Sequence, residues 1–310
     1  MNEPKSPTIS AAEPVINRRC FVHVQGRVHP MKIALQIHLI PGDSVSDRCK
    51  WARDHGVDGI ELIGAPHDRL CAEAEQVLKV LPVTTLCGAF DEHGDRCFDL
   101  LDADIEKRRR AVAVTSRCLE LAGQFGAVGL ILPPIFGPPV VPDLSPFADP
   151  LEIEDALMVA HCRELGAHAV AHDTLLLLEP LNRYEQHYLK QQSDAVRVID
   201  KAAAAGVALL SDLFHMHIEE TDTPAALCAV AGRYTKSIHL ADNTRCEPGT
   251  GDIDFVAAFK ALFEVGYDGY MAYECAITGD DDEQKKANLA RSLTFVRKCV
   301  EEAGGATSHG

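Results

Sequence analysis

The sequence lacks long apolar runs and has few basic residues for its length. A helix that crosses a bilayer needs about 18 consecutive apolar residues, and no stretch of the 310-residue chain provides them. Lysine and arginine together number 30, against 46 aspartates and glutamates, so the formal net charge is −16. This charge repels phosphate backbones and anionic lipid surfaces. We therefore expect no nucleic-acid partner and no membrane partner.

Signals for disulfides and for export are also absent. The 11 cysteines are odd in number, and no two of them have CxxC spacing. Most lie singly within apolar stretches, as Cys118, Cys162 and Cys299 do, which is typical of reduced thiols. The N-terminal segment MNEPKSPTIS contains charges and prolines instead of the apolar core of a signal peptide. These observations predict a cytoplasmic protein.

The composition changes near both ends of the chain. Residues 1–30 are polar and contain prolines, whereas the apolar stretch MKIALQIHLI begins at Met31. The C-terminal EEAGGATSHG is small and polar. We therefore predict a polar N-terminal leader over 1–30, a single catalytic domain over 31–303 and a flexible tail over 304–310.

Between these ends, short apolar stretches alternate with longer amphipathic ones. The pattern predicts eight strands, at 32–39, 59–63, 83–88, 128–132, 175–179, 207–212, 236–242 and 270–274. It predicts helices at 44–55, 67–80, 104–125, 151–171, 194–205, 255–265 and 282–302, with one more short helix after the sixth strand. The repeating unit is therefore a strand followed by a helix.

The predicted strands are apolar throughout, which indicates parallel strands with both faces buried under helices. An open, doubly wound sheet would need a glycine-rich phosphate turn after the first strand, and the sequence there is HLIPGDS. Eight units instead favour an α/β protein with a closed (β/α)8 TIM barrel. The proline-rich segment PPIFGPPVVPDLSPFADP at 133–150 follows the fourth strand and is either a lid or wall of the site or a passive loop.

Polar residues lie at or near the ends of the last four predicted strands: Glu179, Asp212, His239 and Glu274. They are spaced by about 30 residues, one strand–helix repeat, so consecutive strands carry them to the same end of the barrel. Three carboxylates brought together there would repel one another unless a cation lies between them. This oxygen-rich set with one imidazole suits one divalent ion, Mn²⁺ before Mg²⁺ or Co²⁺.

The sequence segments around these residues resemble those of a known family. In chain order, the segments are LLLLEPLNRYEQHYL, LLSDLFHMHIEE, SIHLADNTRCEPGTGDIDF and YMAYECA. They resemble the sugar isomerase/epimerase family with xylose-isomerase-like barrels, and within it the ketose 3-epimerases that act on tagatose, psicose and ribulose. The resemblance covers about residues 31–302 and is most specific from Glu179 to Glu274.

The resemblance implies roles for individual residues. Glu179, Asp212, His239 and Glu274 would hold the metal, while Glu185, His215 and Arg245 would contact substrate oxygens. Removing a proton next to a carbonyl requires bases, and Glu179 and Glu274 could act on opposite faces of the carbon with His215 as a further proton donor. The implied enzyme is a divalent-metal-dependent ketose epimerase or isomerase that acts on a free sugar or polyol ketone through an enediolate held by the metal.

The same family includes lyases, so a dehydratase, a decarboxylase or a C-glycoside-cleaving subunit acting on a 3-keto sugar is the alternative. An apurinic endonuclease would need a basic face, which the charge of −16 opposes. A non-catalytic binding barrel would not need three acids and one imidazole at the same end of the strands, together with Arg245. Further sugar contacts could come from Gln36, His38, Glu61 and His93, and we expect a homo-oligomer.

Overall fold

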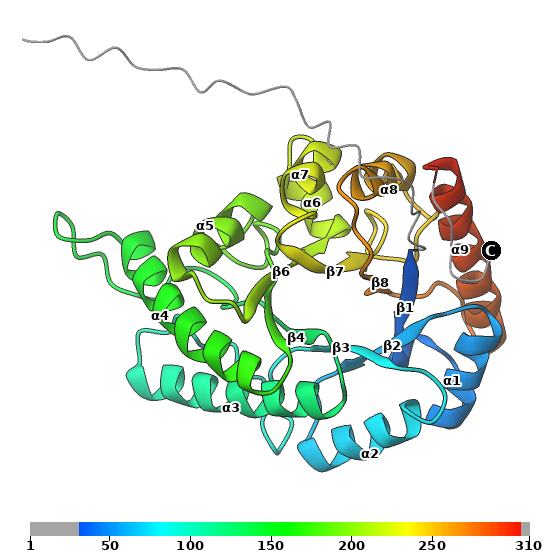
Figure 1. The fold of residues 1–310 in the computed structure, drawn as a ribbon, viewed down its shortest axis with the longest axis horizontal. Helices are drawn as coiled ribbons and strands as arrows, with labels where there is room; N and C mark the ends of the chain where they lie inside the picture. The colour runs from blue at the N-terminus through cyan, green and yellow to red at the C-terminus, as the bar shows by residue number, and fades with distance from the viewer. Residues whose placement is uncertain (1–30, 305–310) are drawn as a thin grey trace, which may run out of the picture.

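Eight parallel strands close into a barrel in the order β1-β2-β3-β4-β5-β6-β7-β8 (Figure 1). The structure is a computed structural model, and it describes residues 31–304. The leader predicted for 1–30, and residues 305–310 of the tail predicted for 304–310, therefore lie outside the described residues. The strands are β1 Lys32–Gln36, β2 Gly59–Ile63, β3 Val83–Cys87, β4 Gly129–Leu132, β5 Leu175–Leu178, β6 Val207–Asp212, β7 Thr235–Leu240 and β8 Tyr270–Tyr273. The TIM-barrel prediction is confirmed.

Helices form a ring outside the strands (Figure 1). They are α1 Val45–Asp54, α2 His67–Val77, α3 Ile105–Gln124, α4 Pro150–Ala171, α5 Gln192–Ala202, α6 Leu213–Glu219, α7 Thr223–Val230, α8 Phe255–Glu264 and α9 Asp282–Glu302. Side chains at the helix starts bind free backbone N–H groups. Asp149 and Glu152 form a reciprocal capping box at the start of α4, where Pro150 is the first helical residue.

Two predicted elements are wrong in detail. The first strand ends at Gln36, and Ile37–Leu39 form a 3-10 turn, η1, in which Ile37 and Leu39 are buried while His38 is exposed. The apolar spacing of this turn is indistinguishable from that of a strand. After β6 there are two helices, α6 and α7, in place of the single short helix predicted, because Asp222 caps a second helical start.

Two groups of apolar side chains stabilise the barrel. A small cluster of Ile131, Leu177, Ala208 and Leu210 fills its interior. Alternate residues of the same strands, such as Leu130 and Leu176, belong to the large cluster between strands and helices. The strands are therefore buried on both faces, as their continuous apolar sequences predict.

Two further features concern the surroundings of the barrel. Among residues 31–304, no helix combines the length and apolarity needed to cross a membrane. No disulfide joins any of the cysteines within that range. The proline-rich segment 133–150 begins at the barrel and then projects outward beside the start of α4 (Figure 1).

Candidate active site

Four polar side chains meet where the last four strands end. Glu179 directly follows β5, Asp212 ends β6, His239 lies in β7 and Glu274 directly follows β8. One ligand atom from each lies within 4.8 Å of the others. Asp212 and His239 are fully buried, and Glu179 is only 2% exposed. The structure thus brings together all four residues that the sequence predicts to converge.

Glu61, in the middle of β2, fixes the orientation of the His239 imidazole. Both carboxylate oxygens of Glu61 lie 3.1 Å from Nε2 of His239, so that nitrogen donates its hydrogen to Glu61. Gln36 Nε2 donates to Glu61 at 2.8 Å, and the Thr85 hydroxyl donates to its other oxygen at 2.5 Å. Nδ1 of His239 therefore faces Glu179, at 3.4 Å, and Glu274, at 3.0 Å.

Charge is unevenly distributed in this cluster. Burial, together with the negative charge of Glu274, raises the pKa of Glu179 to about 8. Burial would also raise the pKa of Glu274, but the charge of His239 and of Arg245 holds it well below its ordinary value. Burial would lower the pKa of His239, yet Glu61 and Glu274 raise it well above 6.5. The positive charge of His239 and Arg245 therefore favours the ionised form of Glu274, whereas Glu179 lacks enough nearby positive charge to offset its burial.

The donor set fits a divalent cation. Within residues 31–304, Glu179 Oε1 and His239 Nδ1 are buried atoms without a hydrogen-bond partner. Unpartnered buried polar atoms are costly, and a metal ion between them and the other two carboxylates would satisfy both. The bond from Glu61 to the far nitrogen is the outer-shell contact that commonly orients a metal-binding histidine.

Arg245 lies over the same cluster. Its Nη1 donates to Asp212 Oδ2 at 2.8 Å, and its Nη2 pairs with Glu274. Its guanidinium lies 4.5 Å from the ring centre of Phe214, a cation–π contact. The residue has a positive φ of 58° in the turn after β7. The resemblance implies that Arg245 contacts substrate, and the structure additionally places it against two candidate metal ligands, Asp212 and Glu274.

His215 lies on α6 beside Asp212. Its Nδ1 accepts the backbone N–H of Asn182 at 3.1 Å, and its Nε2 lies 3.6 Å from Asp212 Oδ2. Burial lowers the pKa of His215, which favours a neutral ring whose hydrogen is on Nε2. Asn182 also donates to Glu185 at 2.8 Å, and Glu185 itself is exposed at the site's rim. Asn182, in the segment PLNRYE, thus links Glu185 and His215, two residues predicted to contact substrate.

A cavity of about 250 Å³ opens above these groups. Its polar end contains the predicted catalytic and substrate-contact residues, and its other end is apolar. The apolar end includes three aromatic rings, of which Phe98 lies 6.1 Å from Phe90 and 5.3 Å from Phe136 between ring centres. Phe136 and Pro133 belong to the proline-rich segment 133–150, so the start of that segment forms a wall of the cavity.

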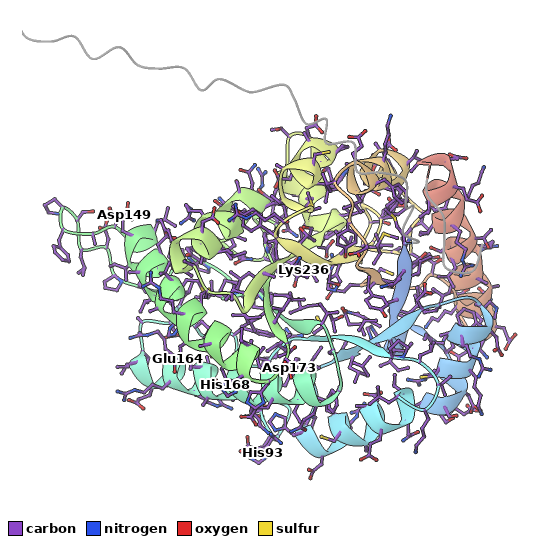
Figure 2. All side chains as sticks on the ribbon, in the orientation of Figure 1. His93, Asp149, Glu164, His168, Asp173 and Lys236 are labelled. Carbon is purple, nitrogen blue, oxygen red and sulfur yellow. The ribbon has the colours of Figure 1, made fainter. Side chains whose placement is uncertain are left out.

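The remaining sugar-contact predictions are not supported by the geometry. Gln36 and Glu61 are buried and hydrogen-bonded to each other below the cluster. His38 is exposed, and neither it nor His93 lines the cavity. Figure 2 shows His93 at the edge of the molecule. The cavity instead contains Arg96 and the aromatic rings, which the sequence did not single out.

Known proteins are similar to this chain in sequence and in fold. The family described as xylose isomerase-like TIM barrel matches residues 49–299. The chain is 31% identical over 277 residues to 3-dehydro-D-guloside 4-epimerase of Escherichia coli, covering 87% of this chain and 100% of that one. It is 34% identical over 119 residues to D-psicose 3-epimerase of Enterocloster bolteae, covering 38% and 39%.

Solved structures agree with this comparison. The apo crystal structure of 3-keto-D-glucoside 4-epimerase from E. coli matches with a TM-score of 0.73 and 30% identity, over 87% of this chain and 100% of that chain. D-psicose 3-epimerase from Clostridium cellulolyticum has the same fold, with a TM-score of 0.74 at 20% identity over 87% and 99%. These relatives are sugar epimerases. The chain belongs to the xylose isomerase-like TIM barrel family.

Proposed function

We propose that the protein is a divalent-metal-dependent epimerase of a keto sugar, acting by proton removal next to the carbonyl. The observation that carries this proposal is the convergence of three carboxylates and one imidazole within 4.8 Å at the floor of a cavity. Its relatives named as sugar epimerases support the reaction class.

Glu179, Asp212, His239 and Glu274 would hold one divalent ion. Three carboxylates and one imidazole are a hard donor set, which suits Mn²⁺ and also Mg²⁺ or Co²⁺. Such an ion polarises a carbonyl and stabilises the negative charge that develops on its oxygen. Protein side chains would therefore carry out the proton transfers, at a carbon that the bound ion makes more acidic.

Inversion of a carbon by removal and return of a proton requires a group on each face of that carbon. Glu179 comes from β5 and Glu274 from β8, with β6 and β7 between them. We assign removal of the proton to one of these carboxylates and its return on the opposite face to the other, which inverts the carbon. His215, through Nε2, and Arg245 would donate hydrogen bonds to substrate oxygens, with Glu185 accepting one at the rim.

The cavity also bears on the class of substrate. Its polar end suits a free ketose or polyol ketone, whereas Phe90, Phe98 and Phe136 offer an apolar surface next to it. An apolar wall of this kind suits a substituent carried by the sugar. A 3-keto glycoside is therefore a second candidate substrate, and the relative named 3-keto-D-glucoside 4-epimerase supports it.

The experiment pairs metal content with product analysis. Wild-type protein loaded with Mn²⁺ is incubated with free ketoses and with 3-keto glycosides. The products are separated by chromatography, and their masses are measured by mass spectrometry. We expect an epimer of unchanged mass from the wild type and at most trace turnover from Asp212→Asn. The matched control is Glu283→Gln, which removes an exposed carboxylate in the first turn of α9.

Three results would contradict the proposal. Loss of water, carbon dioxide or the sugar's substituent would indicate the alternative lyase reaction. Full activity in chelated, metal-free protein would remove the metal from the mechanism. Activity of Asp212→Asn equal to that of Glu283→Gln would show that the cluster is not the site of reaction.

A further inference from the structure

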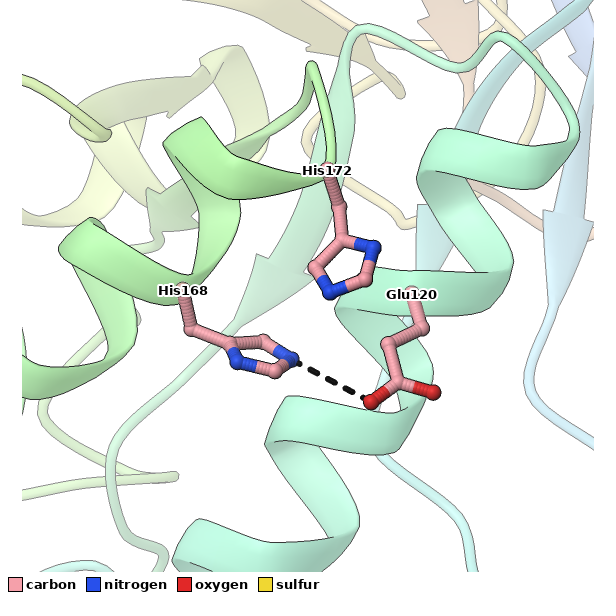
Figure 3. A group of neighbouring side chains, drawn as sticks. All are labelled: Glu120, His168 and His172. Atoms are coloured by element: carbon pink, nitrogen blue, oxygen red, sulfur yellow. Dashed lines mark ion pairs between the residues drawn. The ribbon is translucent and has the colours of Figure 1, made fainter.

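A second cluster of metal-binding side chains lies outside the barrel. Glu120 comes from α3 and His168 from α4, and His172 directly follows α4 as its C-cap residue (Figure 3). One ligand atom from each lies within 4.8 Å of the others. His172 lies three residues before the start of β5, whereas Glu179 directly follows the end of that strand. The cluster is therefore at the end of the barrel opposite the candidate active site.

The packing of α3 against α4 positions this cluster. His168 and His172 are four residues apart and so lie one helical turn from each other on the same face. Gly123 lies at the contact between the helices, where an added Cβ would be 2.1 Å from the carbonyl oxygen of His172. Glycine at 123 therefore allows the end of α4 to approach α3 and brings both histidines beside Glu120.

The distances between the side chains are close to those of a coordinated ion. His168 Nε2 lies 3.4 Å from Glu120 Oε1 (Figure 3). Ligands bound to zinc at about 2.0–2.1 Å in tetrahedral geometry are about 3.3 Å apart. The centres of the His168 and His172 rings are 4.7 Å apart, and all three residues are half-buried. Small side-chain rotations would close the set around one ion.

The carboxylate of Glu120 is already arranged for this role. Arg117 Nη1 donates to Glu120 Oε2 at 2.6 Å, and this bond lowers the pKa of Glu120. The other oxygen, Oε1, faces His168. His168 Nε2 also lies 3.1 Å from the carbonyl oxygen of Ser116, and binding an ion through Nε2 would replace that hydrogen bond.

We propose that Glu120, His168 and His172 form a peripheral site for one transition-metal ion, of which Zn²⁺ is the physiological candidate. Two imidazoles and one carboxylate favour Zn²⁺, Cu²⁺ and Ni²⁺ over Mg²⁺ or Ca²⁺. Three protein ligands leave a coordination position for water or another molecule. The ion joins the C-terminal parts of α3 and α4, and this site is independent of the proposed epimerase reaction.

The test counts bound Zn²⁺ by equilibrium dialysis in the full-length wild type, His172→Gln and His168→Gln. Loss of an outer-shell partner already costs about 10–100-fold in metal affinity, so loss of a direct ligand is expected to cost at least about tenfold. His93→Gln is the matched control, because His93 is exposed on a loop and outside the cluster. We expect one Zn²⁺ more in the wild type and in His93→Gln than in either cluster variant.

A second measurement identifies the ligands independently of stoichiometry. Cu²⁺ added at one equivalent to the Asp212→Asn protein, in which the barrel site is weakened, should give an electron paramagnetic resonance signal with coupling to two nitrogens. Adding His172→Gln should reduce this to one nitrogen. Equal Zn²⁺ counts in all proteins, or a copper signal unchanged by His172→Gln, would overturn the proposal and leave the epimerase assignment untouched.

Discussion

Both carboxylate oxygens of Glu61 lie 3.1 Å from Nε2 of His239, and neither side chain is exposed to solvent. The pair joins β2 to β7 across the interior of the barrel. Because Glu61 occupies Nε2, only Nδ1 of His239 is directed at the three neighbouring carboxylates. The orientation of one candidate ligand is therefore set by a residue that does not belong to the cluster.

Glu61→Gln tests this relationship. Glutamine keeps the size of the side chain but removes the charge that holds the hydrogen on Nε2, so we expect Mn²⁺ affinity to fall by about 10–100-fold with the fold intact. Isothermal titration calorimetry measures the affinity, and circular dichroism checks the fold. Glu283→Gln, an exposed change of the same kind, should bind Mn²⁺ like the wild type. Unchanged affinity in Glu61→Gln would show that Glu61 does not orient His239.

Arg245→Gln should separate substrate binding from metal binding. The change removes a positive charge that pairs with Asp212 and Glu274, so Mn²⁺ affinity should stay the same or increase. The loss of a hydrogen bond from a charged group to substrate should lower kcat/KM by about 10- to 100-fold. Arg233→Gln, at an exposed ion pair with Asp200, serves as the control. A tenfold loss of Mn²⁺ affinity in Arg245→Gln would mean that Arg245 supports the ligands instead.

Metal binding should depend on pH in a defined direction. The pKa of Glu179 is raised to about 8 in the metal-free protein, and that of His239 is also raised, so both hold protons at pH 7. A metal ion needs the deprotonated forms, and binding below pH 8 must therefore release protons. Through the proton on Glu179 alone, apparent affinity should rise with pH by about tenfold per unit below pH 8.

Calorimetry in buffers of different ionisation enthalpy measures this release directly. We expect one to two protons released per Mn²⁺ at pH 7 and fewer in Glu179→Gln. Binding that releases no proton at pH 7 would contradict the electrostatic account of the cluster.

The substrate should carry no phosphate group. Phosphate in TIM barrels commonly binds at the loops after the seventh and eighth strands and at a helix N-terminus. Here Asp281 caps α9, with Asp282 and Glu283 in its first turn, so acidic side chains oppose a phosphate dianion. A matched ketose and ketose phosphate should differ in kcat/KM by at least about tenfold in favour of the free sugar. A tenfold preference for the phosphate would reverse this conclusion.

The convergence of Glu179, Asp212, His239 and Glu274 could be predicted because it depends only on the local sequence of each strand and on the parallel order of the strands. Each lies at the end of an apolar strand, and successive parallel strands of a barrel must end at the same side. The family resemblance added Glu185, His215 and Arg245, and the structure places His215 and Arg245 against the cluster.

Contacts that depend on the packing of distant elements could not be predicted. The sequence analysis names Glu61 as a possible sugar contact, because its position in the chain does not show that it faces His239 across the barrel. The pairing of Glu120 with His168 depends on how closely α3 approaches α4 at Gly123, which no local pattern encodes. The cytoplasmic location and the homo-oligomer stay predictions.

Solvent deuterium exchange tests the central claim most directly. The Mn²⁺-loaded protein is incubated in deuterated water with its keto-sugar substrate, and the recovered sugars are analysed by nuclear magnetic resonance. The account predicts an epimer that carries one deuterium at the inverted carbon next to the carbonyl, and no exchange with Glu179→Gln. An epimer without deuterium at that carbon, formed at the wild-type rate, would contradict proton removal at this site.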